Sequence, residues 1–205
     1  DGAGQTLMSR VLEPETIKSK EVILELYGTH GGHLSVSFYD NDIDNLICLV
    51  DDAAPGRLTY ANAEPVRARG GEFNLESNWN NGWEGRLSYA NRAVALRGHG
   101  ENFADNPRHL AKGNLLFPLV SEQLFGSLEL QYMSARRTPQ QVVSKAHTQV
   151  NVSLHTSEWF GGLKFSAAVK NLLDARYGDP AGVHHRQALI ERQGRRMVLR
   201  ADYSF

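Results

Sequence analysis

Three aspartates at alternate positions, Asp40, Asp42 and Asp44, have the spacing with which a calcium-binding loop begins. A loop of that kind also has glycine at its sixth position and glutamate at its twelfth, where this chain has Asn45 and Asp51. The aspartates continue a segment in which apolar and polar side chains alternate, as they do along a β-strand. We therefore interpret them as the polar end of a strand and predict no calcium site.

Two adjacent histidines, His184 and His185, lie in the longest stretch without a periodic pattern. Histidines that share one metal ion are usually spaced i,i+2 or i,i+4, so this pair is interpreted as part of a solvated loop. Cys48 is the only cysteine, which excludes an internal disulfide and a multi-cysteine metal site. We predict no metal ion or other cofactor.

Arginines are concentrated in the last two stretches between periodic segments. Residues 171–196 contain five arginines against three acidic residues, and two more arginines lie in the stretch before. Guanidinium groups bind carboxylates and phosphates, so these stretches favour an anionic ligand such as a ferric chelate or a phosphate. The alternatives are that the side chains contact lipopolysaccharide phosphates or are only solvated. The candidate ligand-binding residues are Arg136, Arg137, Arg176, His184, His185 and Arg186.

The composition excludes several classes of protein. The 205 residues include 22 Lys and Arg against 23 Asp and Glu, so the charge gives no reason to expect nucleic-acid binding. The longest strictly apolar run covers only residues 46–50, whereas a membrane-spanning helix needs roughly 20. No signal peptide is visible, and Asp1 reads as a position within an element.

Apolar and polar side chains alternate along most of the chain, and no segment has a stripe with a period of 3.6 residues. Val150, Val152 and Leu154, for example, alternate with polar neighbours. Each such segment predicts a strand with one apolar and one polar face. The alternation predicts nine strands, over about residues 19–28, 33–47, 57–78, 83–94, 108–118, 123–134, 147–155, 161–171 and 196–205.

The connections between these strands are alternately short and long. In an up-and-down antiparallel sheet, every second connection lies at the same end, so the short turns collect at one rim and the long loops at the other. Aromatic residues mark the short-turn rim, as at a membrane interface. The chain is therefore predicted to be all-β, part of a transmembrane β-barrel. The rim aromatics are Tyr27, Trp79, Trp83, Phe117, Phe125, Trp159, Phe160 and Phe205.

Two other interpretations fit the same alternation. A soluble β-sandwich turns its apolar faces inward, and periodicity does not distinguish it from a barrel whose apolar face meets lipid. A small complete outer-membrane barrel is the other, although bacterial single-chain barrels have an even number of strands. Either would bind a ligand through its long loops. An outer-membrane hydrolase is disfavoured, because no serine, histidine and acid are grouped in the sequence.

Several segments resemble, in the same order, the C-terminal part of the barrel of TonB-dependent outer-membrane receptors. The family's entry to a mid-barrel strand is resembled by Leu12-Glu13-Pro14-Glu15-Thr16 with Ser19 and Glu21. Its terminal strand is resembled by Gly194-Arg195 leading to Tyr203-Ser204-Phe205. The other similar segments are Asn41-Asp42-Ile43-Asp44-Asn45-Leu46-Ile47, Tyr60-x-Asn62-x-Glu64, Gly71-x-Phe73-x-Leu75-Glu76, Asn106-Pro107-Arg108-His109 and Val169-Lys170-Asn171-Leu172-Leu173-Asp174-x-x-Tyr177.

The resemblance implies an antiparallel barrel of about 22 strands filled by a plug domain. Residues 1–205 would then be a fragment, the C-terminal portion of the barrel, with the plug and the N-terminal strands absent. The implied function is TonB-dependent uptake of a scarce nutrient, such as a ferric siderophore, cobalamin or haem. The chain would supply wall strands and surface loops in the outer membrane of a Gram-negative bacterium, and it would not be an enzyme.

The resemblance also implies the partners. These are the lipid bilayer and lipopolysaccharide, TonB through the missing N-terminal region, an extracellular metal chelate or other nutrient, and the outer-membrane barrel assembly machinery. That machinery would read the terminal strand through Tyr203 and Phe205 by strand addition.

A barrel in a bilayer turns its apolar side chains to lipid and its polar side chains to the interior. Cut from the barrel, the nine strands would leave unpaired edges and an exposed apolar face. We therefore predict that the isolated chain binds detergent or aggregates. The predicted lipid-facing residues are Leu34, Val36, Phe38, Leu128, Leu130, Tyr132, Val150, Val152, Leu154, Leu199 and Tyr203, and the interior ones are Glu25, Glu76, Arg86, Lys164, Lys170, Arg200 and Asp202.

Overall fold

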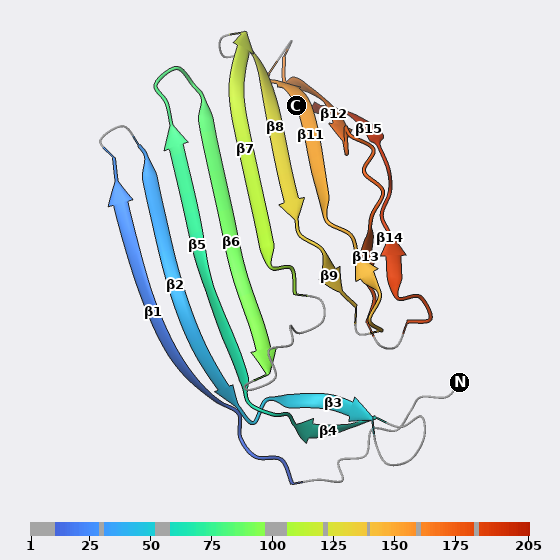
Figure 1. Cartoon of the computed structure of the whole chain (residues 1–205). Helices are drawn as coiled ribbons and strands as arrows, with labels where there is room; N and C mark the ends of the chain where they lie inside the picture. The colour runs from blue at the N-terminus through green and yellow to red at the C-terminus, as the bar shows by residue number, and fades with distance from the viewer. Residues whose placement is uncertain are drawn as a thin grey trace.

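The main sheet has nine strands, one from each of the nine segments in which apolar and polar residues alternate, and all of them pair antiparallel (Figure 1). The computed structural model describes residues 11–28, 31–51, 58–96, 106–120, 123–138, 140–158, 161–182 and 185–205. Within these ranges it contains strands, turns and irregular segments, and no helix that could cross a membrane. The sheet consists of β1 (Thr16–Tyr27), β2 (His33–Asp44), β5 (Val66–Asn78), β6 (Glu84–Leu96), β7 (His109–Val120), β8 (Leu124–Met133), β11 (His147–Thr156), β12 (Leu163–Lys170) and β15 (Arg196–Tyr203).

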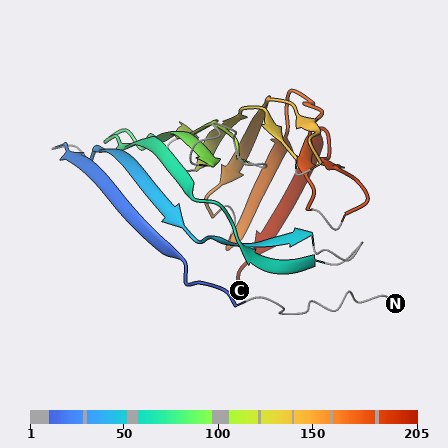
Figure 2. The same ribbon diagram turned by 60° about the horizontal axis from the view of Figure 1, so that its bottom comes forward.

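These strands lie in the sheet in the order of the sequence, β1-β2-β5-β6-β7-β8-β11-β12-β15. The short turns lie at the top of Figure 1 and the long connections at its bottom. Figure 2 shows that the sheet is a single curved layer with β1 and β15 at its two edges. The predicted up-and-down arrangement of nine strands is therefore confirmed.

The structure corrects two of the predicted strands. The segment 57–78 is divided into β4 (Leu58–Asn62) and β5, and the strand predicted for 33–47 ends at Asp44. Pro65 has no N–H to donate to a ladder, and Asn45 has a φ of 59°, which turns the chain out of the sheet. β4 pairs instead with β3 (Ile47–Asp51), and this hairpin extends beyond the sheet (Figure 1).

Two of the long connections contain short hairpins that the periodicity did not predict. β9 (Arg136–Arg137) pairs with β10 (Val143–Ser144), and β13 (Gly178–Pro180) pairs with β14 (Leu189–Glu191). Strands of two or three residues are too short to show an alternating pattern. These hairpins matter for the function because they fix loops that would otherwise have no regular structure.

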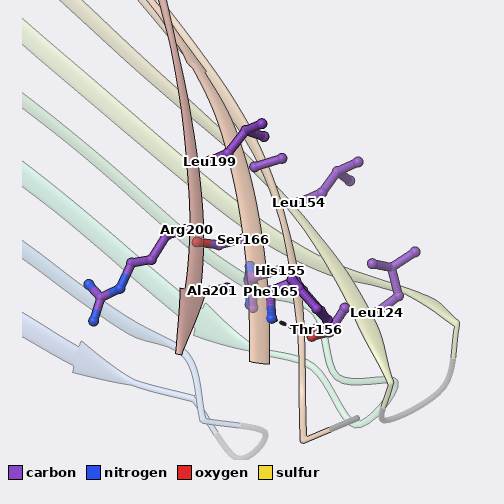
Figure 3. A pocket seen from close by; sticks show the side chains of 10 residues that line it. Leu124, Leu154, His155, Thr156, Phe165, Ser166, Leu199, Arg200 and Ala201 are labelled. Atoms are coloured by element: carbon purple, nitrogen blue, oxygen red, sulfur yellow. Dashed lines mark hydrogen bonds between the residues drawn. The ribbon is translucent and has the colours of Figure 1, made fainter. Parts of the chain in front are cut away.

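The strand registers divide the side chains of the sheet between two faces. Paired residues of antiparallel strands share a face, so the pairs Leu34↔Leu75, Leu75↔Leu87 and Leu128↔Val152 belong to one apolar face. Every residue predicted to face lipid lies on that outer face, and every residue predicted to face the interior lies on the other. Figure 3 shows the division at β15, where Arg200 points away from Leu199 and from Leu154 of β11.

The outer face is uncovered. Leu199 is 78% exposed and Tyr203 is 65% exposed, and an apolar hollow of about 490 Å³ lies between β11, β12 and β15 (Figure 3). A soluble sandwich would bury these side chains beneath a second sheet. Because the described strands form one main layer with only three small hairpins beside it, the sandwich interpretation is wrong.

The rim aromatics do not all lie on one face. Trp83 and Phe117 lie on the outer face with ring centroids 5.3 Å apart. Tyr27 and Phe125 belong to the inner face, where they stack on His33 and His155. The sequence placed these aromatics at the correct end of the strands, but only some of them can reach a membrane interface. Trp159 and Phe160 lie outside the described residues.

Candidate functional site

Three of the segments used for the family resemblance meet where β2 turns into β3. The Asn62 side chain accepts a hydrogen bond from the Glu13 backbone N–H (2.9 Å) and donates to the carbonyls of Glu13 and Asn45. Asn45 donates to the Glu13 carboxylate (3.0 Å), and Glu15 accepts from the Ile47 N–H (2.6 Å). These bonds hold the base of the β3–β4 hairpin against the segment that leads into β1.

Another resembling segment forms the turn after β12. The Asn171 side chain accepts from the Ala175 N–H (2.9 Å) and donates to the Ala175 carbonyl (3.0 Å), which closes a tight turn. Asp174 accepts from the Arg195 N–H (2.7 Å), so the two ends of the last long connection are joined. Gly194 lies beside this carboxylate, and a Cβ at that position would collide with Asp174 Oδ1. The segment therefore directs the chain between β12 and β15 and holds it there.

The last two long connections are fastened together above the inner face. Arg136 in β9 donates to Asp179 in β13 (2.8 Å), and Arg192 donates to the other oxygen of the same carboxylate. The Ser144 hydroxyl donates to the Gly178 carbonyl (2.7 Å) and is buried. The Arg136 side chain is only 12% exposed, whereas that of Arg192 is 58% exposed. Asp179 is thus the carboxylate that joins the two loops.

These loops and the inner face of the sheet line a partly open polar cavity of about 740 Å³. Its aromatic wall is the stacked pair of His147 and Tyr177, whose ring centroids are 3.7 Å apart, and the Tyr177 hydroxyl donates to Gln149 (3.1 Å). Four cations line the cavity against two carboxylates. The lining residues are Gln131, Met133, Arg136, His147, Gln149, Lys170, Asn171, Tyr177, Asp179, Glu191, Arg192, Gln193, Gly194 and Arg196.

Hydrogen bonds shift the pKa values of two groups in the last long connection, Arg192 in the cavity and Asp174 outside it. The hydrogen bond to Asp179 raises the pKa of the Arg192 guanidinium. The backbone hydrogen bond from Arg195, followed by the nearby charge of Arg176, lowers the pKa of Asp174. Arginine and lysine side chains are protonated at neutral pH, so the four cations that line the cavity outnumber its two carboxylates and favour an anion.

The structure brings only one of the predicted ligand-binding residues into the cavity, namely Arg136. Arg137 is exposed, and Arg176 is 78% exposed and pairs with Asp174. His185 and Arg186 are exposed on the last connection, and His184 lies outside the described residues.

Sequence reasoning missed Asp179, His147, Tyr177 and Gln149 as site residues, and it treated Arg192 only as one charge among several. The sequence pointed to Arg192 as a ligand-binding residue only through its place in a cation-rich stretch, and no sequence pattern pairs Arg192 with Asp179. Two of the aspartates weighed as a calcium loop pair with arginines instead. Asp40 accepts from Arg67 (2.8 Å) and Arg69 (3.2 Å), and Asp42 lies 3.7 Å from Arg67. Within the described residues, no three His, Cys, Asp or Glu side chains are grouped so as to hold a metal ion.

Solved outer-membrane receptor structures share this fold. The ferric-catecholate import receptor Fiu of E. coli K12 matches with a TM-score of 0.74 and 16% identity, over 95% of this chain and 28% of its own. The ferripyoverdine receptor of Pseudomonas aeruginosa matches with a TM-score of 0.78 and 13% identity, over 96% of this chain and 28% of its own. The siderophore receptor PiuA of Acinetobacter baumannii matches with a TM-score of 0.76 and 15% identity, over 95% of this chain and 29% of its own. At these identities the likeness shows the fold alone, and the chain spans less than a third of each receptor.

A comparison with curated protein sequences found no match. The sequence profile described as "TonB dependent receptor-like, beta-barrel" matches residues 1–172, which is most of the chain. That family comprises receptors and transporters rather than enzymes. Together with the single curved sheet and its divided faces, the match confirms the resemblance: the chain belongs to the TonB-dependent receptor β-barrel family.

Proposed function

We propose that the protein is an outer-membrane receptor of a Gram-negative bacterium that takes up a scarce nutrient by TonB-dependent transport. Residues 1–205 supply the C-terminal portion of the barrel wall and its surface loops. The outer face supports the location, because an apolar face on a single curved sheet is what an outer-membrane barrel presents to lipid. TonB itself would contact a part of the receptor outside these 205 residues.

The proposed ligand is anionic, and the cavity at the long-loop end of the inner face carries this proposal. It holds Arg136, Lys170, Arg192 and Arg196 against two carboxylates, at the end of the sheet opposite the short turns. Among ferric siderophores, cobalamin and haem, this excess of cations favours an anionic ferric chelate. Three structures with the same fold are named for siderophore or ferric-chelate uptake, which agrees with this choice.

We assign the first contact to the exposed loop residues and the binding to the cavity. Arg137, Arg176 and Arg186 would attract the ligand by their charge, because long-range attraction needs no fixed geometry. His184 and His185 lie in the same connection as Arg176 and Arg186 and would offer ring nitrogens as further contacts. Arg136 and Arg192 would then bind its oxygens, aided by the aromatic wall of His147 and Tyr177. Asp179 already presents a carboxylate to these two arginines, which indicates that they can hold an oxyanion between them.

The test uses the complete receptor in an iron-limited Gram-negative strain that lacks its other siderophore receptors, supplied with ferric enterobactin or ferric citrate. Replacing both Arg136 and Arg192 by Ala should lower uptake of the chelate at least about tenfold, since each arginine contributes a charge-assisted hydrogen bond. The matched control is Arg137→Ala with Arg176→Ala, which removes as many charges outside the cavity and should have a weaker effect. Uptake that is equal in the two double variants would contradict the assignment of the cavity.

The terminal strand has a second proposed role, in assembly. Tyr203 lies on the outer face of β15, which forms one edge of the sheet, and its ring is 6.2 Å from that of Phe205. An edge strand with free hydrogen-bonding groups can be bound by strand addition. We therefore propose that the assembly machinery reads Tyr203 and Phe205. Deleting Phe205 should lower the amount of receptor in the outer membrane, and a normal amount would reject this role.

A further inference from the structure

The two arginines assigned to ligand binding already hold a carboxylate of the chain itself. Arg136 donates to Oδ1 of Asp179 (2.8 Å), and Arg192 donates to Oδ2. Arginines bind a carboxylate or phosphate of a ligand with the same charge-assisted hydrogen bonds. Asp179 therefore occupies the position between the two guanidinium groups in which the oxygens of an anionic ligand would lie.

The three side chains differ in their access to solvent. The side chain of Arg192 is 58% exposed, that of Asp179 is 26% exposed and that of Arg136 only 12%. An incoming oxyanion would therefore meet Arg192 first and would reach Arg136 only after Asp179 has moved aside. Removing the acceptor of a largely buried guanidinium is costly unless another acceptor replaces it. Asp179 should accordingly leave Arg136 only in exchange for an oxygen of the ligand.

Asp179 also connects two loops, so its displacement would change their contact. The β13–β14 hairpin contacts the β9–β10 hairpin through the charged bond between Asp179 and Arg136 and through the neutral bond from Ser144 to the Gly178 carbonyl (2.7 Å). A hydrogen bond between ionised groups is roughly twice as strong as a neutral one. Loss of the charged bond would therefore loosen the β13–β14 hairpin, which forms one side of the cavity.

We infer that Asp179 is an internal competitor of the ligand: an oxyanion of the ligand takes its place between Arg136 and Arg192 and thereby releases the β13–β14 hairpin. This inference depends on the proposed function, because it concerns the same cavity. It adds that binding of an anionic chelate loosens this loop instead of ordering it, and that one residue of the loop controls the affinity.

The competition sets a requirement on the ligand. The chain keeps Asp179 beside the arginines at an effective concentration in the millimolar range or above, so one small carboxylate cannot displace it at low concentration. A ferric chelate with several anionic oxygens can, because it also reaches Lys170 and Arg196 in the same cavity. The site should therefore select such a chelate over a neutral one, which has no charge with which to replace the carboxylate.

Isothermal titration calorimetry of ferric citrate and ferric enterobactin with the complete receptor in detergent tests the competition. Asp179→Asn keeps the volume of the side chain and removes its charge, so a larger fraction of the receptor has its arginines available and the apparent dissociation constant falls in proportion. We expect at least about tenfold tighter binding, because a hydrogen bond between charged groups is lost to the competitor. The matched control, Glu191→Gln, removes the same charge from the same cavity, leaves Asp179 in place and should bind only slightly more tightly. If Asp179 served only to order the loops, Asp179→Asn would instead bind more weakly.

Hydrogen exchange of the unchanged receptor tests the release of the hairpin. With a saturating amount of the anionic chelate, the amides of residues 178–192 should exchange at least about tenfold faster, whereas ferrichrome, a neutral ferric chelate, should leave their exchange unchanged. Unchanged or slower exchange with the anionic chelate would overturn the inference, as would equal acceleration by ferrichrome.

The affinities separate this inference from the proposed function. Binding by Asp179→Asn that is no tighter than binding by Glu191→Gln would overturn the inference and leave the assignment of the cavity standing. Failure of both anionic chelates to bind the unchanged receptor would instead refute the proposed function.

Discussion

Asp179 should control the order of the last long connection, because two arginines depend on it. In Asp179→Ala, the largely buried Arg136 loses its carboxylate, whereas Arg192 can turn to solvent. A hydrogen bond to a charged group contributes about 1.5–3 kcal/mol when its partner is withdrawn from water. A surface ion pair contributes only about 0–1 kcal/mol. We therefore expect a cost of about 2–4 kcal/mol, most of it from the pair with Arg136.

Hydrogen exchange of the complete receptor measures this cost locally. In Asp179→Ala, the amides of residues 171–195 should exchange at least about 30-fold faster, which corresponds to 2 kcal/mol. The amides of β5 and β6 are distant from this site and should be unchanged. Asp179→Asn keeps the volume of the side chain and should give a smaller effect, because the amide oxygen still accepts one bond.

Double-mutant cycles divide the free-energy cost of Asp179→Ala between its ion pairs with Arg136 and with Arg192. The coupling between Arg136 and Asp179 should exceed that between Arg192 and Asp179 by about 1 kcal/mol or more, because burial strengthens the first pair. Equal couplings, or unchanged exchange in Asp179→Ala, would refute the conclusion that this carboxylate fastens the two loops.

Three other predictions concern the last connection and the outer face. Because its hydrogen bond lowers the pKa of Asp174, that group contributes stability at pH values above its ordinary pKa of 3.8, and the contribution is lost as the pH falls through the lowered value. The protection of the amides of residues 171–195, measured as the intrinsic exchange rate at each pH divided by the observed rate, should accordingly fall in acid. Asp174→Asn should remove this dependence; a dependence that persists in the variant would exclude Asp174 as its source. Gly194→Ala should disorder the same segment, because the new Cβ would collide with Asp174. Gly182→Ala is the control and should not, because its Cβ would be 3.9 Å from the nearest atom. Equal effects of the two variants in circular dichroism and hydrogen exchange would contradict this geometry. Residues 1–205 produced alone should sediment as aggregates or bind detergent because of the uncovered apolar face, and a clean monomer without detergent, measured by light scattering, would count against it.

The sequence predicted the main sheet because its strands are long. Segments of 8 to 13 residues show a period of two clearly, and the short turns between them fix the order of neighbouring strands. The same period of two also assigned each side chain to the outer or the inner face. A shift of a strand by one residue would have moved all of its side chains to the opposite face. The hairpins β3–β4, β9–β10 and β13–β14 were missed because their strands have two to five residues.

The cavity was predicted only in part, for a different reason. The excess of arginines pointed to the correct loops, and Arg136 lies where an anion site would require it. The pairing of Asp179 with two arginines depends on contacts over 43 and 13 positions, which no local pattern encodes. The stacking of His147 on Tyr177 likewise depends on how the last connection folds back over β11.

The apolar side chains of this sheet should face lipid while their polar neighbours face an aqueous interior. Spin labels placed singly along β11, in the complete receptor with Cys48→Ser and in a bilayer, test it directly. Labels at Val150, Val152 and Leu154 should be accessible to oxygen dissolved in lipid, and labels at Gln149, Asn151 and Ser153 to a water-soluble nickel chelate. Accessibility that does not alternate with a period of two, or that alternates in the opposite phase, would contradict the claim.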